Sequence, residues 1–532
     1  MRDKHDVVIV GAGLSGMYQL IKLRELGMNI RVLEMGSDVG GTWYWNRYPG
    51  ARFDSESYSY GMSFSKELLQ EWEWSEHFSA QPETLRYCGF ISEKFDLSRD
   101  IEFNTRVTGA YYEEARNIWQ VITEDKIYEC RFLITAVGVF SVPTWPEIEG
   151  INDFQGEAWH TARWPHHPVD FSGKRVAVIG TGATGVQVIP EVAKTAGTLT
   201  VFQRRPNYCL PLGNRPITEK EQADIKGRYD EIFAQCASTT GSFLHGSDPR
   251  SALSVSDEER EAAFERLYNM PGFALWLGNF SDCGTDQEAN DFVSEFVRRK
   301  ISERVNDPEL AEKLIPLDHG FGTRRVPMES GYYEVYNQDD VRLIDLIATP
   351  FQRITKAGIE TTAENFDFDL IIYATGFDAI VGSFRNMDIQ GRKGAKLKDY
   401  WEDGPVTYLG VQVPGFPNLL TLVGPQNAST FCNIPRCIEQ NVEWVSDLMA
   451  HMMAHGYERV EAAQTAAEAW VEHSEQMVAM TLIPNTDSWF MNVNQNLPEK
   501  KRTFLAYAGG APRYKQKCDE VAAAGYTGFD FA

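Results

Sequence analysis

The chain contains no long apolar run and no paired-cysteine motif. Nowhere in its 532 residues do about 18 apolar residues follow one another, so the sequence predicts no membrane-spanning helix. Its eight cysteines form no Cys-x-x-Cys pair, which argues against a zinc site and against a disulfide framework, and we expect no bound metal. Cys432 and Cys437 are predicted to be buried thiols.

Positive charge is also scarce. The chain has 51 Lys and Arg against 75 Asp and Glu, a formal net charge of -24. Such a surface repels phosphate backbones and anionic headgroups, so we expect neither nucleic acid nor membrane as a principal partner. The start, MRDKHDVVIVGAG, enters a strand pattern at once and leaves no room for a cleavable signal peptide. We expect a cytoplasmic protein, a monomer or weak oligomer, with two or three domains because one core seldom supports this length.

Two strand-turn-helix units with glycine-rich turns organise the chain. The first begins with the apolar strand 6–10. After it, Gly11 permits a tight turn, Gly13 lets the backbone approach a pyrophosphate, and Gly16 lets the helix pack on the sheet. Glu34 closes the next strand, where a carboxylate accepts hydrogen bonds from ribose hydroxyls and repels a 2′-phosphate. The first unit therefore suits FAD or NAD and not NADP.

The second unit has cations where the first has an acid. Strand 174–179 leads into the turn 180–185, and the distal strand ends with Arg204 and Arg205. Guanidinium groups bind phosphate in a bidentate manner, so this unit should prefer the 2′-phosphate of NADPH. Because no redox-active cysteine pair is present, a disulfide reductase is disfavoured and oxygen is the simplest electron acceptor.

An aromatic segment follows the first unit. Residues 40–54, GGTWYWNRYPGARFD, are too aromatic for a solvated loop and too rich in glycine and proline for a helix, so they should line a flat ligand. Asp54 is expected to be buried there, and a buried carboxylate needs a cation as its partner. Far along the chain, Arg324 and Arg325 are two adjacent cations in a glycine- and proline-bounded loop, one expected to face a phosphate and the other the flavin.

The segment 154–165, here called the linker segment, lies between the two units and belongs to neither. Prolines on both sides predict an extended linker and not a helix or a central strand. We expect it to act as a hinge strap that concerns both cofactors. It reads Phe-x-Gly-x-x-x-His-x-x-x-Trp-Pro, in which the named positions are Phe154, Gly156, His160, Trp164 and Pro165.

These segments resemble the motifs of one family, the type I Baeyer-Villiger monooxygenases. The linker segment matches the family fingerprint, and Gly41-x-Trp43-x-x-x-x-Tyr48-Pro49-Gly50-x-x-x-Asp54 resembles a second family motif, beside the paired glycine turns. Related enzymes that oxygenate nitrogen or sulfur typically lack the Trp164-Pro165 pair. The resemblance covers nearly the whole chain.

The resemblance implies FAD and NADPH as cofactors and a ketone and O2 as substrates. NADPH would reduce FAD, and O2 would then give a C4a-peroxyflavin that attacks the ketone to yield an ester or lactone. Arg325 would stabilise the peroxide and the adduct electrostatically, because an arginine is not deprotonated in proteins. Asp54 would hold Arg325 in place. Arg324 stands where family members usually carry lysine, which is a departure from the pattern.

The glycine patterns and the same match predict the cofactor contacts. His160 would position the linker segment against the NADP domain. FAD would contact Gly11, Gly13, Ser15, Gly16, Glu34, Thr42, Trp43, Tyr44, Trp45, Asp54, Tyr60, Val107 and Ile434. NADP would contact Arg52, Asp54, Gly180, Thr181, Gly182, Ala183, Thr184, Gly185, Val186, Arg204, Arg205, Arg324, Arg325 and Trp489.

The predicted fold is α/β, with two Rossmann-like dinucleotide-binding domains and a helical insertion in the NADP domain, where the pattern becomes charged and helical. Residues 424–436 resemble a loop beside the substrate pocket of the family. The predicted ranges are 1–142 and 377–532 for the FAD domain, 143–172 for the linker, 173–216 and 321–376 for the NADP domain, and 217–320 for the insertion.

Two other functions stay open at this point. The chain is also compatible with a flavin-dependent N- or S-oxygenase, or with a flavoprotein that senses NADP without turnover. The sequence does not choose among cyclic, aryl, macrocyclic and steroid ketones.

Overall fold

The first sheet carries the first glycine turn. The structure is a computed structural model that describes residues 2–427, 432–498 and 500–532. Val7, Val8 and Ile9 are fully buried, because strand β1 lies between parallel neighbours and helices cover the sheet. The strand order is β17-β4-β5-β6-β1-β2-β3, and β18 also pairs with β6. The strands are β1 (Arg2–Val10), β2 (Ile30–Leu33), β3 (Ile101–Glu102), β4 (Val107–Glu113), β5 (Ile118–Thr123), β6 (Ile127–Thr135), β17 (Asp388–Gln390) and β18 (Leu419–Thr421).

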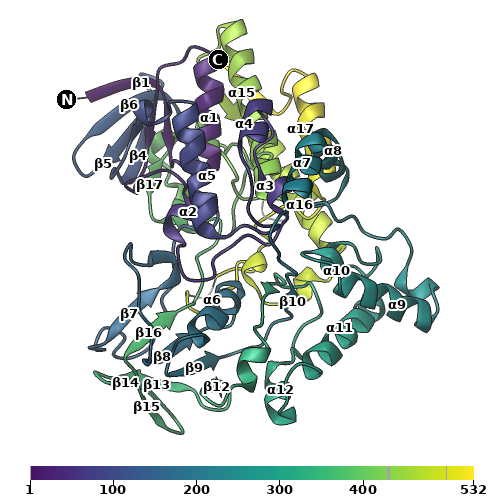
Figure 1. Cartoon of the computed structure of the whole chain (residues 1–532). Coiled ribbons are helices and arrows are strands. Elements are labelled where there is room, and N and C mark those ends of the chain that lie inside the picture. The colour runs from purple at the N-terminus through teal and green to yellow at the C-terminus, as the bar shows by residue number, and fades with distance from the viewer. Residues whose placement is uncertain (1, 428–431, 499) are drawn as a thin grey trace.

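The second sheet is entirely parallel and carries the second glycine turn. Its order is β12-β9-β8-β16-β7. Figure 1 shows the two sheets in separate halves of the molecule, joined by several crossing segments. The strands of this sheet are β7 (Glu157–His160), β8 (Arg175–Ile179), β9 (Thr198–Gln203), β12 (Val341–Asp345) and β16 (Leu370–Tyr373). The described residues also form three small sheets. The first contains β13 (Phe351–Ile354), β14 (Gly358–Thr361) and β15 (Asn365–Asp367), the second β10 (Leu210–Pro211) and β11 (Met328–Glu329), and the third β19 (Val460–Ala462) and β20 (Phe529–Phe531).

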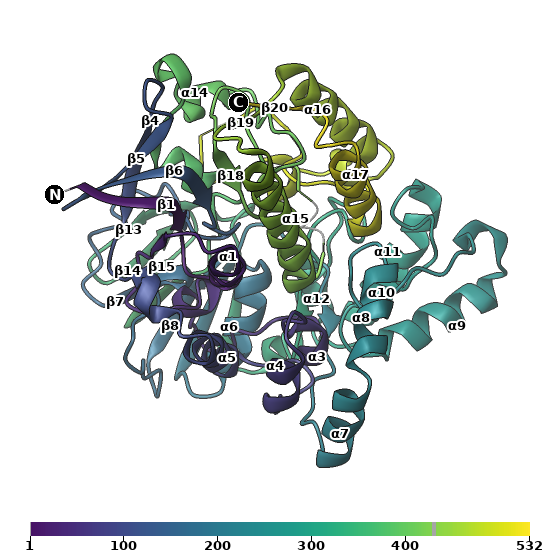
Figure 2. The same ribbon diagram turned by 90° about the horizontal axis from the view of Figure 1, so that it is seen from above.

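Helices cover both sheets and form the segment that the sequence predicts to be helical. Figure 2 shows α7, α9 and α11 on the side of the molecule away from β4 and β5. The helices are α1 (Leu14–Glu25), α2 (Thr42–Trp45), α3 (Ser57–Tyr60), α4 (Lys66–Glu71), α5 (Gln81–Lys94), α6 (Ala183–Ala193), α7 (Glu219–Gly227), α8 (Tyr229–Ser238), α9 (Asp257–Tyr268), α10 (Ala274–Leu277), α11 (Gln287–Ser302), α12 (Pro308–Leu314), α13 (Gly382–Arg385), α14 (Leu397–Tyr400), α15 (Ile434–His455), α16 (Gln464–Ala479) and α17 (Ala511–Ala523).

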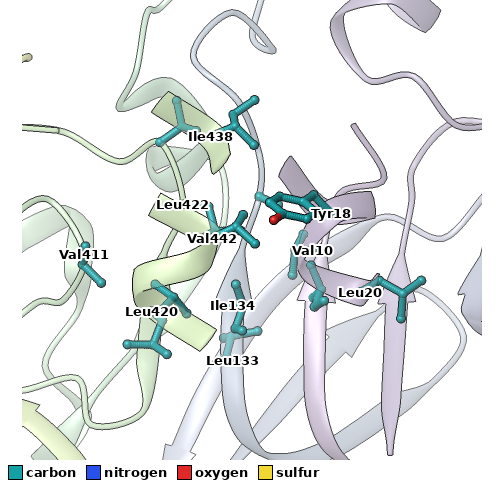
Figure 3. Packing of buried hydrophobic residues seen from close by; sticks show 14 of the residues in the cluster. Val10, Tyr18, Leu20, Leu133, Ile134, Val411, Leu420, Leu422, Ile438 and Val442 are labelled. Carbon is teal, nitrogen blue, oxygen red and sulfur yellow. The ribbon is translucent and has the colours of Figure 1, made fainter. Parts of the chain in front are cut away.

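The core of the first half joins the two ends of the chain. Ile438 and Val442 of α15 are buried beside Leu422, which follows β18, and face Tyr18 of α1 (Figure 3). Leu419 to Thr421 continue the sheet on β6, so residues beyond 418 complete a structure that residues 2–135 begin. None of the helices in the described ranges is long and apolar enough to cross a membrane.

Two local predictions are wrong in part. Residues Thr42–Trp45 form one helical turn, because Gly41, with φ of 52°, turns the chain and lets Trp45 donate back to its carbonyl. In the linker segment, Glu157–His160 is extended and pairs with β16 at the edge of the second sheet, as an extended and non-central segment should, but Thr161–Arg163 forms a 3-10 turn. Pairing with a strand more than 200 residues later is invisible to local pattern reading.

The prediction of two buried thiols is also wrong. Cys432 and Cys437 are buried, but the structure joins their sulfur atoms in a disulfide. The start of α15 at Ile434 brings the two residues together, with Cα atoms 6.7 Å apart, a separation that a disulfide can span. The other six cysteines are free and buried.

Candidate active site

The two glycine turns have the same geometry. Gly11 has φ of 106° and Gly180 has φ of 107°. A Cβ on Gly11 would lie 2.5 Å from the carbonyl oxygen of Ala136, and a Cβ on Gly180 would lie 2.5 Å from that of Ala374. Each turn therefore presses against the end of a strand returning to its own sheet, where only glycine fits.

The other glycines of the two turns have two different roles, close packing of the helix and space at its N-terminus. A Cβ on Gly16 or Gly185 would meet the carbonyl oxygen of the first glycine of its turn at 1.9 and 2.2 Å, whereas one on Gly182 would meet nothing within 4 Å. Gly13 and Gly182 are the N-caps of α1 and α6, and neither helix start has a side-chain cap. Both helix N-termini thus offer amide donors without a side-chain cap, beside open space at Gly182 and against the backbone of Gly41 at 3.5 Å at Gly13, which fits a pyrophosphate at each turn. Ser15, Ala183, Thr184 and Val186 lie in the first turns of these helices, and the hydroxyl of Thr181 donates to the carbonyl of Arg205.

Glu34 lies where a ribose acceptor is needed. Its two carboxylate oxygens accept hydrogen bonds from the amides of Ala12 and Gly36, each at 2.7 Å. Burial raises the pKa of Glu34, and these amide donors oppose the rise. Each oxygen keeps a second lone pair, so the carboxylate can still accept from ribose hydroxyls.

The aromatic segment 40–54 forms a buried cluster. Trp43 donates from Nε1 to the hydroxyl of Tyr60 at 3.0 Å, and the ring of Phe53 stacks on Tyr60 at 4.3 Å between centroids. Val107 is buried in the same core. Tyr44 and Trp45 lie edge to face, while Thr42 is exposed. Arg52 is turned toward Glu76 and the carbonyl of Phe78, and Ile434 starts α15.

Asp54 and Arg325 form an ion pair. Nη2 of Arg325 donates to Oδ2 of Asp54 at 2.9 Å, and the Asp54 side chain is only 5% exposed. Burial raises the pKa of Asp54, and the charge of Arg325 opposes that rise. Arg325 is 29% exposed and lies 4.9 Å from the ring centroid of Phe273 and 5.2 Å from that of Trp276. The helical insertion, through α10, thus supplies aromatic walls beside the cation.

Gln187 links this pair to the second unit and was missed in the sequence. It lies on α6, donates from Nε2 to the carbonyl of Arg52 at 3.0 Å, and lies 3.4 Å from Oδ1 of Asp54. Its Oε1 accepts from the hydroxyl of Tyr48 at 2.7 Å. The signal available was its place two residues after Gly185, on the first turns of a dinucleotide-binding helix.

A cavity of about 1160 Å³ lies at the end of β9 and is here called the arginine cavity. Arg204, Arg205, Arg324 and Arg502 line it together with Asp318. Arg325 and Trp489 are not among the residues that line it. Four guanidinium groups at the end of the second strand of a dinucleotide unit suit a 2′-phosphate.

The linker segment contacts both halves of the molecule. His160 is buried, its Nδ1 accepts from the amide of Ala162, and its Nε2 lies 3.3 Å from the hydroxyl of Thr375. Burial lowers the pKa of His160 to about 4, so the imidazole is neutral at pH 7. Thr375 donates to the carbonyl of Thr144 at 2.6 Å, so His160 lies beside two of the segments that cross between the halves.

Other linker residues pack on the aromatic segment and on the core. The guanidinium of Arg163 lies 4.7 Å from the ring of Trp45. Trp164 is buried in the core of the second half, and Pro165 follows it. Gly156 has no room for a Cβ, which would lie 2.5 Å from the ring of Phe154.

The loop around Trp489 crosses between the halves. The Trp489 ring lies 5.1 Å from that of Phe140, edge to face. The side chain of Asn494 donates to the carbonyl of Phe377, and that of Asn496 donates to the carbonyl of Thr375. The hydroxyl of Thr486 donates to the hydroxyl of Thr323. Of the predicted pocket-side loop 424–436, residues 428–431 lie outside the described part of the chain.

The two dinucleotide-binding units, one with an acid and one with arginines at the ribose position, define the class: a flavoprotein oxidoreductase that uses a pyridine nucleotide. The family described as pyridine nucleotide-disulphide oxidoreductase matches residues 8–232. Over nearly its full length, the chain belongs to the Baeyer-Villiger monooxygenases, NADPH-dependent oxidoreductases that contain FAD.

Individual relatives support this membership. The chain is 46% identical to the 2-oxo-Delta(3)-4,5,5-trimethylcyclopentenylacetyl-CoA monooxygenase of Pseudomonas putida, over 99% of this chain and 98% of the relative. It is 43% identical to the cyclohexanone 1,2-monooxygenase of Acinetobacter sp, over 99% of this chain and 96% of the relative. A crystal structure of OTEMO in complex with FAD and NADP superposes with a TM-score of 0.96 at 46% identity and covers 99% of both chains.

Proposed function

We propose that this monooxygenase converts a cyclic ketone to a lactone, with Arg325 as the residue that stabilises developing negative charge. The observation that carries the proposal is the buried ion pair between Arg325 and Asp54. The chemistry that FAD supplies when bound is its two-electron reduction by NADPH and the activation of O2. The protein must place the reactants and stabilise charge.

Arg325 is suited to that task because the protein holds its guanidinium in place while engaging only some of its N–H donors. Asp54 occupies one donor nitrogen, and Nη1 donates to the carbonyl of Val326, which leaves further N–H groups of the guanidinium for a ligand. The rings of Phe273 and Trp276 cover part of the guanidinium, which is 29% exposed, and so reduce its contact with water. A fixed cation of this kind stabilises an oxyanion without reorganising during the reaction.

Glu34 and the arginine cavity divide the cofactors between the units. We assign FAD to the first unit, because the carboxylate of Glu34 would repel a 2′-phosphate. We assign NADPH to the second, because Arg204, Arg205 and Arg324 attract one. The boundaries given for the two domains, the linker and the insertion are part of this proposal.

The substrate class is proposed from the names of relatives, and the setting from the charge of the chain. Two relatives carry names that refer to a cyclopentenyl and a cyclohexanone substrate, which favours a cyclic ketone. The net charge of -24 argues against a nucleic-acid partner, and we propose a cytoplasmic enzyme that is a monomer or weak oligomer.

The test measures three quantities in one reaction. The FAD-loaded protein is mixed with NADPH and cyclohexanone, and NADPH oxidation, oxygen consumption and lactone formation are followed together. We expect one lactone for each NADPH and O2 consumed. NADPH binding without steady oxygen consumption would instead identify a sensor. Oxygenation of a sulfide or amine, with no product from any ketone of a cyclic and aryl panel, would identify a heteroatom oxygenase.

A further inference from the structure

A path of polar contacts begins in the arginine cavity. Oδ2 of Asp318 lies 3.6 Å from Nη1 of Arg205 and accepts from Nη2 of Arg324 at 3.4 Å. The other oxygen, Oδ1, lies 2.7 Å from Nδ1 of His319. One carboxylate therefore holds two guanidinium groups at the cavity and an imidazole behind them.

The path continues inward to Arg325. The side chain of His319 is fully buried, and its Nε2 lies 3.3 Å from Oδ1 of Asn207. Nδ2 of Asn207 donates to the main-chain carbonyl of Arg325 at 2.9 Å. That bond fixes the orientation of the amide, so its oxygen is the atom that faces His319. Both ring nitrogens of His319 therefore face oxygen acceptors, and only the doubly protonated imidazolium donates to Asp318 and Asn207 at once. Asp318, His319 and Asn207 are here called the polar path.

The presence of Asp318 in this cavity is unexpected for a phosphate site, because a carboxylate repels the phosphate that the arginines attract. The hydrogen bond from His319 lowers the pKa of Asp318 to about 2, so the acid is ionised at neutral pH. A 2′-phosphate would compete with Oδ2 of Asp318 for the N–H groups of Arg205 and Arg324. Any shift of the carboxylate then moves the group bonded to Oδ1, which is His319.

We propose that Asp318, His319 and Asn207 are positioning residues that couple a 2′-phosphate in the arginine cavity to the placement of Arg325. The inference rests on the proposed function, because it assumes that this cavity receives the 2′-phosphate of the nucleotide. Arg324 and Arg325 are neighbours in the chain, so main-chain movement is a competing route. Asn207 separates the two routes, since shortening its side chain cuts the polar path and leaves the main chain intact.

The experiment uses the FAD-loaded full chain and two small probes. Adenosine 2′,5′-bisphosphate carries a 2′-phosphate, and adenosine 5′-monophosphate does not. Amide hydrogen exchange is measured by mass spectrometry in peptides that cover residues 203–206, at the cavity, and residues 325–328, at the far end of the polar path. In the parent protein we expect the bisphosphate to slow exchange in both peptides and the monophosphate to slow neither.

Asn207→Ala is the decisive variant. It should keep the protection of residues 203–206 and lose that of residues 325–328. Its kcat with NADPH should fall about fivefold, the equivalent of one net hydrogen bond, with KM for NADPH unchanged. Tyr333→Phe is the matched control, because the Tyr333 hydroxyl contacts the main chain of Asn207 and Cys209 and not the Asn207 amide side chain, so residues 325–328 should stay protected as in the parent.

The outcomes separate the two proposals. If the bisphosphate leaves residues 203–206 unprotected in the parent, the assignment of the cavity fails. If it protects them but never residues 325–328, or protects both in Asn207→Ala, the coupling is overturned and the cavity assignment stands. Should Asn207→Ala fail to fold, His319→Gln cuts the same path and is measured in its place.

Discussion

Oδ2 of Asp54 accepts a hydrogen bond from Nη2 of Arg325 at 2.9 Å, although 271 residues separate them in the chain. Replacing Arg325 with alanine removes the cation that we assign to charge stabilisation, and loss of one such donor typically slows the chemical step about 10²–10³-fold. We therefore expect Arg325→Ala to bind FAD normally and to lose lactone formation by that factor. Product yield and the flavin absorbance of the purified variant check this.

Two further variants sharpen that prediction. Arg325→Lys keeps the positive charge but loses the planar set of guanidinium N–H donors, so it should retain more activity than the alanine variant and less than the parent. Arg299→Ala removes an exposed arginine that pairs with Glu261 on the insertion, and should match the parent. Equal lactone rates for Arg325→Ala and the parent would exclude the assigned role.

Gln187 and Tyr48 should act as one unit. Gln187→Leu removes the acceptor of the Tyr48 hydroxyl and the donor to the Arg52 carbonyl, and Tyr48→Phe removes only the hydroxyl. We expect each variant to lower kcat. The rise in activation free energy of the double variant should be smaller than the sum of the two single rises by about 0.5–3 kcal/mol, as for groups in direct contact. Lys194→Ala, an exposed residue at the C-cap of the same helix, is the control. Full additivity of the two changes would show that the contact has no part in catalysis.

The two glycines of the second turn should respond differently to alanine. Gly182→Ala places a Cβ in open space, so the variant should keep its melting temperature and lose affinity for NADP+ in a binding titration. Gly185→Ala places a Cβ 2.2 Å from the carbonyl oxygen of Gly180, so it should lower the unfolding free energy by about 1–3 kcal/mol or more. Unimpaired NADP+ binding by Gly182→Ala would contradict the assignment of NADP to this turn.

The arginine cavity should decide between the two nicotinamide nucleotides. A hydrogen bond to a charged group contributes about 1.5–3 kcal/mol, so Arg204→Ala or Arg205→Ala should raise KM for NADPH by about tenfold to a hundredfold. KM for NADH should not change, because NADH has no 2′-phosphate. Arg342→Ala on neighbouring β12, where the arginine pairs with Glu364, is the surface control. A parallel rise for both nucleotides would argue against 2′-phosphate recognition.

His160 should make stability depend on pH. Its pKa in the folded protein is about 4, below the ordinary 6.5, so the unfolded chain binds more protons between these values. Stability from this group is therefore present above pH 6.5 and is lost as the pH falls toward 4, by up to about 3 kcal/mol. Calorimetric melting temperatures of the parent and of His160→Gln, from pH 7.5 to 4.5, should converge as the pH falls. A constant difference would contradict this origin.

Local sequence patterns predicted the parts of the fold that depend on near neighbours. The turns at Gly11 and Gly180 follow from an apolar strand before the glycines and a helix after them, and these contacts span only a few residues. The opposite charges at Glu34 and Arg204 were likewise readable, because strand length fixes where the second strand ends.

Long-range pairings were not readable from local pattern. The partnership of Asp54 with Arg325 was expected only through the family resemblance. Gln187 is one of three polar residues on α6, with Thr184 and Glu191, and nothing in its neighbours shows that it points at another domain's loop. The strand at 157–160 exists because β16 lies beside it, a contact that a short stretch such as EAWH does not reveal.

Strand β18 has a consequence for synthesis on the ribosome. It occupies the edge of β6 at Leu133 to Thr135, beyond the residues that β5 covers, so that edge has no partner until residue 421 has emerged. Translation of the intervening 286 residues (421 minus 135) takes about 15–60 s at typical speeds of about 5–20 residues per second. A nascent chain thus carries an open, apolar strand edge for most of its synthesis, and chaperone demand during expression should track that interval.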